Sequence, residues 1–256
     1  MPDRDPHSSP TLRVCALYPD LMNIYADRGN LLVLQRRCQW RGLGFELLAS
    51  GLGEPLDASA ADLFYIGGGQ DRDQRLCAED LIENKSAALH EAAARNAVVL
   101  GVCGGYQLLG HSYILGSEEI AGVGLLDLST VREDGPRLIG NVAIEVSLEQ
   151  APDGSDRKRV LAGFENHGGR TRLAAGQPAL GRVLKGHGND GRSGSEGARS
   201  ANTIGTYLHG PLLPKNVWFA DWLIARALGI EPDALTALDD ELEHEAHLSA
   251  RRAAGV

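Results

Sequence analysis

The chain has 256 residues, of which 43% are hydrophobic and 23% are charged, so it is long enough to bury a substantial core. Its 25 Lys and Arg residues face 34 Asp and Glu residues, giving a formal net charge of −9 without the basic clusters that bind nucleic acid. The apolar runs are far shorter than the ~20 residues that span a bilayer. The first ten residues are polar and contain no apolar signal-peptide segment. We therefore expect a cytoplasmic protein without a membrane span.

The cysteines give no sign of a metal site or of a disulfide framework. They stand at positions 15, 38, 77 and 103, and no two of them form a CxxC pair. A structural zinc site usually requires closely spaced pairs, and disulfides require an oxidising compartment. We therefore predict no metal, and we expect most of these thiols to be small buried hydrophobic groups.

Strands and helices alternate in the first half of the chain. Four apolar segments have the pattern of strands, namely residues 12–18, 45–48, 62–66 and 97–102. Helical stretches at about 28–41 and 74–96 lie between them. The last of the four strands is continuously apolar, as expected of a strand that is covered on both faces. This alternation predicts an α/β fold with a doubly wound, mostly parallel sheet and flanking helices.

The pattern changes after Gly110. Short strands are predicted at about 142–146, 160–164, 181–185 and 203–207, and the absence of helical periodicity between them favours antiparallel or mixed pairing. Residues 186–197 are so polar and glycine-rich that we expect a mobile surface loop that does not pack. Helices are predicted at about 215–228 and 233–252. We divide the chain into a flexible tail at 1–11, one domain at 12–230 and a helical extension at 231–256.

Cys103 has the sequence context of a nucleophile. It ends a predicted strand and begins a predicted helix, and glycines stand two residues before it and two residues after it, at Gly101 and Gly105. A tight strand-to-helix turn needs such small neighbours and leaves its central side chain exposed. The backbone N–H of Gly104 is then placed to donate to an oxyanion, and the helix N-terminus favours a thiolate.

A cysteine nucleophile needs a base, and His209 is the preferred candidate. It follows the predicted strand 203–207 and precedes Gly210, so it lies at a strand end, where the sites of parallel sheets collect. His167 is the competitor, because it also stands beside glycines at the end of a predicted strand. On spacing alone we favour His209.

Three consecutive glycines, Gly67 to Gly69, directly follow a strand. Their N–H groups can face a neighbouring strand end, which makes Gly68 a candidate for a second oxyanion donor. A phosphate cradle is less consistent with the sequence, because neither GxxxxGK[ST] nor GxGxxG occurs. We therefore predict no nucleotide site on this chain.

With these residues the sequence resembles the class I, triad-type glutamine amidotransferases. Cys103 follows the glycine turn by about 35 residues, and His209 follows Cys103 by about 105, which is similar to the spacing of that family. More narrowly, it resembles the cobyric-acid-synthase-like branch, and within that branch the glutaminase subunits of lipid II isoglutaminyl synthases. The segments that carry the resemblance are residues 25–30, 64–72, 103–107, 163–171 and 205–211.

The resemblance implies a reaction and a partner. Cys103 would attack the side-chain amide of L-glutamine, with His209 as general base and then as acid to the leaving ammonia. Arg137 matches the arginine that contacts glutamine in this family, and Gln107 is expected to bind the substrate as well. The ammonia would pass to a Mur-ligase-like synthetase subunit, forming a heterodimer that amidates the D-glutamate of the lipid II stem peptide. ATP and Mg²⁺ would belong to that partner, and no cofactor is expected on this chain.

The third member of the triad is undetermined. The wider class places a glutamate two residues after the histidine, whereas Pro211 stands there in this chain. The cobyric-acid-synthase-like branch also lacks that glutamate. Asp27 is our candidate, because its motif follows the first strand and should face the same end of the sheet. Asp20 and Glu165 remain alternatives.

Two other functions stay open. One is a glutaminase that serves another acceptor, such as a corrinoid, although cobyric-acid-type enzymes usually carry their synthetase domain on the same chain. The other is a non-catalytic binding module on the same fold, in which Cys103 is inert or redox-sensitive. The Cys103, His209 and Arg137 set argues against the binding module, because such a module has no need of all three residues.

Overall fold

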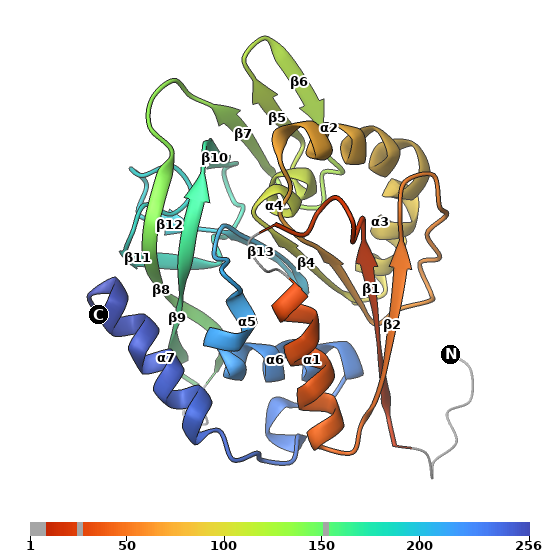
Figure 1. Cartoon of the computed structure of the whole chain (residues 1–256), viewed down its shortest axis with the longest axis vertical. Helices are drawn as coiled ribbons and strands as arrows, with labels where there is room; N and C mark the ends of the chain where they lie inside the picture. The colour runs from red at the N-terminus through yellow and green to blue at the C-terminus, as the bar shows by residue number, and fades with distance from the viewer. Residues whose placement is uncertain (1–8, 25–27, 151–153) are drawn as a thin grey trace.

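The computed structural model describes residues 9–24, 28–150 and 154–256. Its centre is a six-stranded sheet with the order β13-β14-β4-β3-β1-β2 (Figure 1). Five strands run parallel, namely β1 (Thr11–Leu17), β2 (Gly44–Ser50), β3 (Leu63–Ile66), β4 (Val98–Val102) and β14 (Thr203–Thr206). The short strand β13 (Ala198–Ser200) pairs antiparallel with β14 at one edge. The predicted parallel α/β sheet is therefore confirmed.

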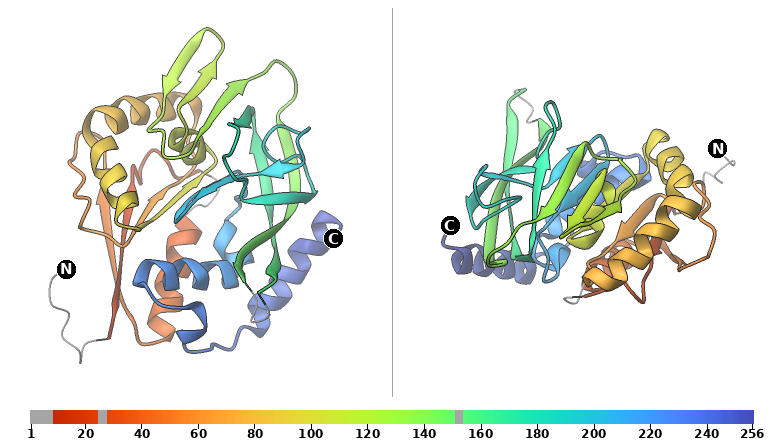
Figure 2. Two further views of the ribbon diagram at one scale, coloured as in Figure 1. Left: turned by 180° about the vertical axis from the view of Figure 1, so that it is seen from behind. Right: turned by 90° about the horizontal axis from the view of Figure 1, so that it is seen from above.

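Helices cover both faces of this sheet (Figures 1 and 2). The crossover from β1 to β2 runs through α1 (Arg28–Trp40), and the crossover from β3 to β4 runs through α2 (Asp71–Asp80), a π-helical turn η1 (Leu81–Lys85) and α3 (Ser86–Ala94). The two crossovers move in opposite directions along the sheet. Because such crossovers are right-handed, their helices lie on opposite faces. Strands β3 and β4 carry no polar or charged side chain other than the Tyr65 hydroxyl, and every residue in them is buried.

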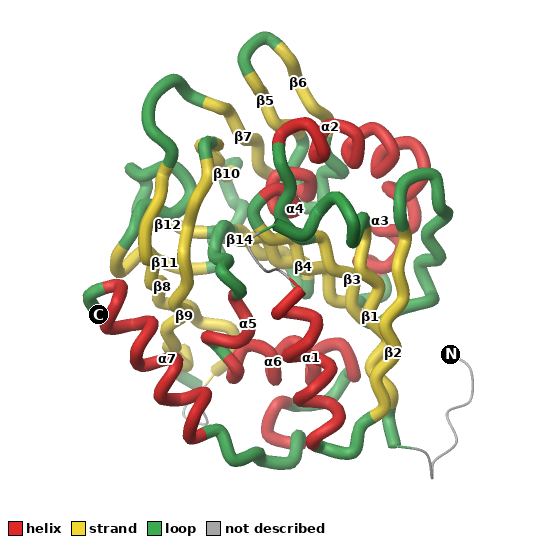
Figure 3. The backbone as a smooth tube through the Cα atoms, in the orientation of Figure 1, coloured by secondary structure: helices red, strands yellow, loops and turns green. Residues whose placement is uncertain are grey.

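The second half of the chain adds two four-stranded sheets beside the central one (Figure 3). One has the order β10-β7-β5-β6 and consists of β5 (Ser112–Leu115), β6 (Glu118–Ala121), β7 (Leu128–Arg132) and β10 (Gly169–Leu173). The other has the order β12-β11-β8-β9 and consists of β8 (Leu138–Gln150), β9 (Asp156–His167), β11 (Gly181–Lys185) and β12 (Ser195–Glu196). Their pairing is antiparallel except between β5 and β7.

The prediction that residues 186–197 do not pack is wrong. Asn189 and Glu196 are fully buried. The Asn189 side chain donates to the carbonyl of Gly197 (3.0 Å) and accepts the N–H of the same residue (2.9 Å). The Glu165 carboxylate accepts the N–H groups of His187 (2.6 Å) and Gly188 (2.9 Å). The polar groups of this loop therefore bind one another and the neighbouring strand, which removes the need for apolar side chains.

The helices at the C-terminal end also differ from the prediction. The stretch predicted at 215–228 is two helices, α5 (Leu212–Lys215) and α6 (Val217–Leu228), which meet at Asn216. The Asn216 side chain donates to the carbonyls of Ala162 and Leu212 (both 2.8 Å), so it satisfies backbone groups where the helix breaks. The helix predicted at 233–252 begins later. A 3-10 turn, η2 (Pro232–Ala234), precedes α7 (Glu241–Ala254), which packs on β8 and β9.

No helix in the described ranges is long and apolar enough to cross a bilayer.

A buried ion pair fastens the π-helical turn to the end of β1. The Lys85 ammonium, fully buried, donates to the Asp80 carboxylate. That carboxylate also accepts the Tyr18 hydroxyl (2.7 Å), the Gly53 N–H (2.8 Å) and the Asn84 amide (2.8 Å). Burial raises the pKa of Asp80, but these hydrogen bonds outweigh it and lower that pKa to about 2. The Asp80 carboxylate is therefore charged at neutral pH.

We predict that Lys85→Met lowers the free energy of unfolding by about 3 kcal/mol, because it leaves the Asp80 charge buried without its cation. Urea unfolding at pH 7 measures this change. Lys158→Met is the matched control, since the Lys158 side chain is 64% exposed and its loss should change stability by less than about 0.5 kcal/mol. Equal effects of the two substitutions would show that the buried pair is not important for stability.

Candidate active site

Cys103 lies on a strained turn between β4 and α4 (Gly104–Leu109). Its backbone has φ 54° and ψ −106°, in a region that residues with a side chain rarely adopt. Its N–H donates to the carbonyl of Thr206 (2.8 Å), which ties the turn to the neighbouring strand β14. Strain of this kind persists only where the surrounding structure enforces it, and it is concentrated at functional sites. The predicted strand–turn–helix geometry around Cys103 is confirmed, but the expected exposure of its side chain is wrong, because Cys103 is buried with 7% exposure.

The flanking glycines are required because backbone packs against them. A Cβ atom on Gly105 would lie 2.2 Å from the carbonyl oxygen of Ile66. A Cβ atom on Gly101 would lie 2.7 Å from the Leu109 side chain and 2.8 Å from the Gly105 carbonyl oxygen. All three distances are too short for any side chain, so the turn accepts only glycine at these two positions.

The glycine turn after β3 lies directly against the Cys103 turn. The Gly105 N–H donates to the carbonyl of Gly67 (3.0 Å), and a Cβ atom on Gly104 would lie 3.1 Å from the Gly69 nitrogen. The Gly68 carbonyl accepts the N–H of Ile24 (3.1 Å), which fixes the other side of this turn. The structure thus brings together the two segments that carry the predicted oxyanion donors, Gly104 and Gly68.

His209 leaves the sheet at the same edge as Cys103. Strands β14 and β4 are parallel neighbours, and Thr206 is in register with Val102, so the residues after both strands emerge together. The backbone of His209 exchanges two hydrogen bonds with Phe164 on β9 (2.9 and 3.1 Å). The His209 side chain is almost completely buried, with 1% exposure. Two of the predicted catalytic residues therefore lie on adjacent strand ends.

The surroundings of His209 favour a neutral imidazole. Burial lowers its pKa to about 4, and the positive charges of Lys215 and Arg137 act in the same direction. A general base must be unprotonated at the working pH. At neutral pH His209 is in that form.

His167, the competing histidine, is packed inside the second half of the fold. Its ring stacks on Tyr207 with centroids 3.6 Å apart, and its Nδ1 lies 2.9 Å from the carbonyl oxygen of Gly169. Burial lowers its pKa to about 3. Its Nε2 lies 4.0 Å from the Glu165 carboxylate. His167 therefore supports the segment that leads to His209.

Arg137 and Gln107 occupy different depths of the site. Arg137 is exposed just before β8, where its guanidinium donates to the side-chain oxygen (2.7 Å) and the carbonyl (2.6 Å) of Asn166. Gln107 is buried on α4, where it accepts a hydrogen bond from Gln74 (2.9 Å) and donates to the Tyr207 hydroxyl (3.1 Å). Contact of these two residues with a substrate stays a prediction.

Two of the three candidates for the third triad member can be located. Asp27 lies outside the described residues. Asp20 is exposed after β1. Glu165 is fully buried on β9, but its carboxylate holds the N–H groups of His187 and Gly188. The known hydrogen bonds of Glu165 thus assign it to the support of residues 186–188.

Sequence reasoning missed a buried polar network around Tyr207. The Tyr207 hydroxyl lies 2.6 Å from the hydroxyl of Thr171, which in turn lies 2.8 Å from that of Thr130. The Glu196 carboxylate accepts the Tyr207 N–H (2.6 Å), and burial raises the pKa of Glu196 to about 8. These residues are far apart in the chain and share no motif. The one available signal was the polar pair Thr206-Tyr207 at the end of an apolar strand.

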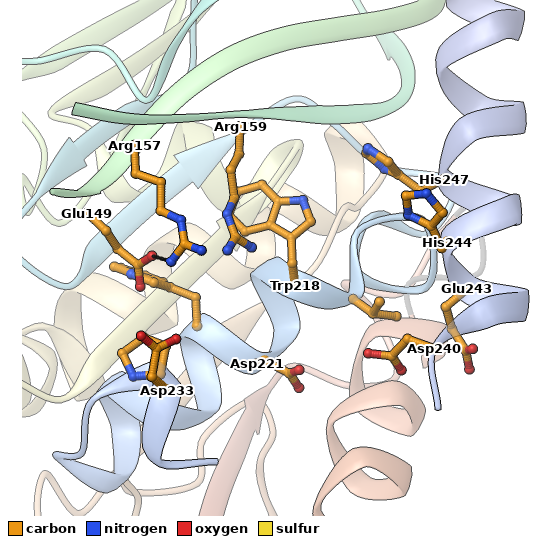
Figure 4. Close-up of a pocket in the computed structure, with 13 residues that line it drawn as sticks. Glu149, Arg157, Arg159, Trp218, Asp221, Asp233, Asp240, Glu243, His244 and His247 are labelled. Carbon is orange, nitrogen blue, oxygen red and sulfur yellow. Dashed lines mark ion pairs between the residues drawn. The ribbon is translucent and has the colours of Figure 1, made fainter. Parts of the chain in front are cut away.

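A separate pocket of about 290 Å³ lies between the far ends of β8 and β9 and the helices α6 and α7 (Figure 4). Arg157 and Arg159 face Asp233 and Asp221 across it, and the Arg159 guanidinium lies 4.9 Å from the centre of the Trp218 ring. Its described lining includes none of the predicted site residues. No group of three or more His, Cys, Asp and Glu side chains in the described ranges is arranged to hold a metal ion.

Comparison with protein families matches residues 13–217 to the CobB/CobQ-like glutamine amidotransferase domain. The chain is similar to the lipid II isoglutaminyl synthase (glutamine-hydrolyzing) subunit GatD of Staphylococcus aureus, with 37% identity over 91% of this chain and 90% of the relative. The subunit of the same name from Streptococcus pneumoniae is 35% identical over 85% of this chain and 80% of the relative. A cobyric acid synthase of Dehalococcoides mccartyi is 37% identical over 46% of this chain and 24% of the relative.

Solved structures agree on the fold. PurLQS from Thermotoga maritima superposes with a TM-score of 0.56 at 19% identity, covering 93% of this chain and 98% of that chain. The glutaminase domain of Trypanosoma brucei CTPS with bound acivicin gives a TM-score of 0.52 at 14% identity, covering 86% and 95%. At these identities the likeness concerns the fold alone.

We predict that Gly105→Ala lowers the free energy of unfolding by about 3 kcal/mol or more, because the new methyl group collides with the Ile66 carbonyl oxygen. Chemical denaturation of the two proteins under the same conditions checks this. The control is Gly51→Ala, where a Cβ atom would meet only the flexible Glu54 side chain at 3.5 Å or more, and where we expect a change below about 0.5 kcal/mol. A Gly105→Ala variant as stable as the wild type would contradict the close contact between Gly105 and the Ile66 carbonyl oxygen.

Proposed function

Because the chain belongs to the CobB/CobQ-like glutamine amidotransferase family, we propose that it is the glutaminase subunit of a lipid II isoglutaminyl synthase. The observation that carries the proposal is the strained Cys103 turn beside the segment that ends in His209, in a chain that matches such subunits along nearly its whole length. The proposed subunit hydrolyses L-glutamine and delivers ammonia to an ATP-dependent, Mur-ligase-like partner in the cytoplasm.

The proposed chemistry begins at Cys103. Its thiol gives a proton to His209, and the sulfur attacks the amide carbon of the glutamine side chain, forming a tetrahedral intermediate. The C–N bond then breaks as His209 returns the proton to the leaving nitrogen, which departs as ammonia and leaves a thioester on Cys103. Water attacks the thioester, the C–S bond breaks, and glutamate and the free thiol are regenerated.

The oxyanion and the substrate are held by separate groups. The N–H groups of Gly104 and Gly68 are the proposed oxyanion donors, since their segments already lie against each other. Arg137 is the proposed partner of the glutamine α-carboxylate, because a guanidinium forms two parallel hydrogen bonds with a carboxylate. Gln107 is the second proposed substrate-binding residue, and its hydrogen bond from Gln74 fixes its buried side chain on α4.

The share of each relative's length that this chain matches favours lipid II over a corrinoid as the final acceptor. The chain matches 90% of the length of the Staphylococcus aureus subunit. It matches only 24% of the length of the cobyric acid synthase, so most of that synthase lies outside the match. A protein of the first kind needs a separate synthetase subunit, and we propose that ATP and Mg²⁺ bind there. The strained backbone of Cys103 costs folding free energy. A non-catalytic module would have no use for this strain, which favours a catalytic role.

We predict that an electrophilic glutamine analogue labels the purified chain at Cys103, and that an excess of glutamine blocks the labelling. Peptide mass spectrometry locates the adduct. His209→Ala should abolish labelling because the thiol loses its base, whereas Cys77→Ala, which removes a buried thiol elsewhere in the core, should label normally. A chain that is not labelled even with its partner present would favour the binding module.

The acceptor is tested with the same proteins. The chain should co-purify with a Mur-ligase-like partner, and the pair with ATP and Mg²⁺ should convert the D-glutamate of lipid II to D-isoglutamine. Cys103→Ala should abolish the reaction with glutamine but not the reaction with added ammonia, because ammonia bypasses the glutaminase step. Amidation of a corrinoid in place of lipid II would establish the alternative acceptor.

We predict that Asp27→Asn reduces kcat for glutamine hydrolysis at least tenfold, which corresponds to about 1.4 kcal/mol of activation free energy. The reason is that Asp27 is the proposed partner that orients His209. Steady-state kinetics of the chain with its partner measure the change, and Asp57→Asn, at an exposed position between β2 and β3, serves as the matched control. Unchanged turnover in Asp27→Asn would remove this residue from the mechanism.

A further inference from the structure

Lys215 is a half-buried cation whose ammonium group forms no ion pair and no hydrogen bond within the described part of the chain. Burial lowers its pKa, so its charge is held at a cost. A methionine at this position would pack about as well as the four methylene groups of Lys215, and it would have no charge to desolvate. The stability of the fold therefore gives no reason for the ammonium group.

The backbone around Lys215 is held firmly. Lys215 is the last residue of α5, and its carbonyl oxygen lies 2.9 Å from Nδ1 of His247 on α7. The N–H of Leu213 donates to the Asn30 side chain on α1 (2.8 Å), and Asn216 caps the carbonyl of Leu212 (2.8 Å). Helices α7 and α1, together with the adjoining residue Asn216, thus fix the short helix from which the Lys215 side chain extends.

The side chain reaches the residue that follows His209. A Cβ atom on Gly210 would lie 3.4 Å from the Lys215 Nζ and 3.4 Å from the Cβ of Phe164, so the ammonium group lies over the Gly210 backbone. Gly210 has φ +84°, which turns the chain sharply after His209 and brings α5 back toward the histidine. The ammonium group is therefore placed by the fold beside the His209 segment.

Charged and titratable groups act on His209 or follow the neighbouring strand. Lys215 of α5, Arg137 before β8 and His167 of β9 interact with it electrostatically, and Cys103 follows β4, the parallel neighbour of β14. Arg137 is exposed and bound to Asn166, and the proposed function uses it for the substrate. Lys215 is the cation of this set for which neither a partner nor a substrate role is assigned.

We propose that Lys215 is a positioning residue of the glutaminase reaction, whose ammonium group acts through His209 by holding a positive charge beside the imidazole. This inference rests on the proposed function for its chemical role. A neighbouring cation disfavours the imidazolium form, so His209 begins the reaction as a neutral base. After it takes the proton from Cys103, the same charge makes the imidazolium a stronger acid, which promotes proton transfer to the departing ammonia.

The direct test is an NMR titration of the His209 imidazole in the full-length chain, assigned with His209→Gln. In Lys215→Met the pKa of His209 should rise by at least about 0.5, as expected for removal of a cation several ångströms away. The protonated fraction at pH 4.5 should then be about twofold higher than in wild type. Lys215→Arg, which keeps the charge, and Lys158→Met, which removes an exposed lysine six residues before Phe164 on β9, should titrate like wild type.

Kinetics of glutamine hydrolysis give an independent readout. The ratio of kcat/KM at pH 4 to kcat/KM at pH 7 should fall about twofold in Lys215→Met and be restored in Lys215→Arg. An unchanged ratio with a raised KM for glutamine would mean that Lys215 binds the substrate, and it would overturn the proposal. An unmoved pKa of His209 in Lys215→Met would overturn it as well. The NMR titration needs no substrate, so a chain without glutaminase activity would refute the proposed function and leave this electrostatic test intact.

Discussion

The site depends on the close approach of two backbone turns at the edge of the central sheet. The Cys103 turn donates one N–H to Gly67 after β3, and it donates another to Thr206 at the end of β14. Gly105 makes this approach possible, since any side chain there would occupy the position of the Ile66 carbonyl oxygen. Cys103, the glycine turn and the His209 segment are thus joined by main-chain hydrogen bonds, which vary little with the side chains around them.

The local features of the site could be predicted from sequence, and the features that depend on distant partners could not. The buried strands and the Cys103 turn are encoded by consecutive residues, namely apolar runs that end in glycine. Residues 186–197 are ordered by groups far along the chain, as when Asn189 meets the Tyr106 hydroxyl (3.1 Å), so their composition was misleading. The same reason explains the late start of α7 and the missed strands β5, β6, β7 and β10, which are short and owe their pairing to neighbours.

The segment that carries His209 is fixed by buried polar groups. Tyr207 stacks on His167, its hydroxyl meets Thr171 and Gln107, and its N–H is held by Glu196. Each of these groups would be costly to bury alone, but a network in which every member has a partner is rigid and specifies one arrangement. These hydrogen bonds hold the backbone segment that leads to His209, the proposed catalytic base.

The two hydrogen bonds between His209 and Phe164 give the site a mechanical property. His209 emerges from the central sheet, but its backbone is paired with β9, which is 12 residues long and belongs to a different sheet. At about 3.3 Å per residue, β9 is roughly 40 Å long, and His209 pairs with it at Phe164, near its C-terminal end. A small tilt of the β8–β9 hairpin relative to the central sheet would therefore change the separation of the imidazole and the thiol while every strand remained intact.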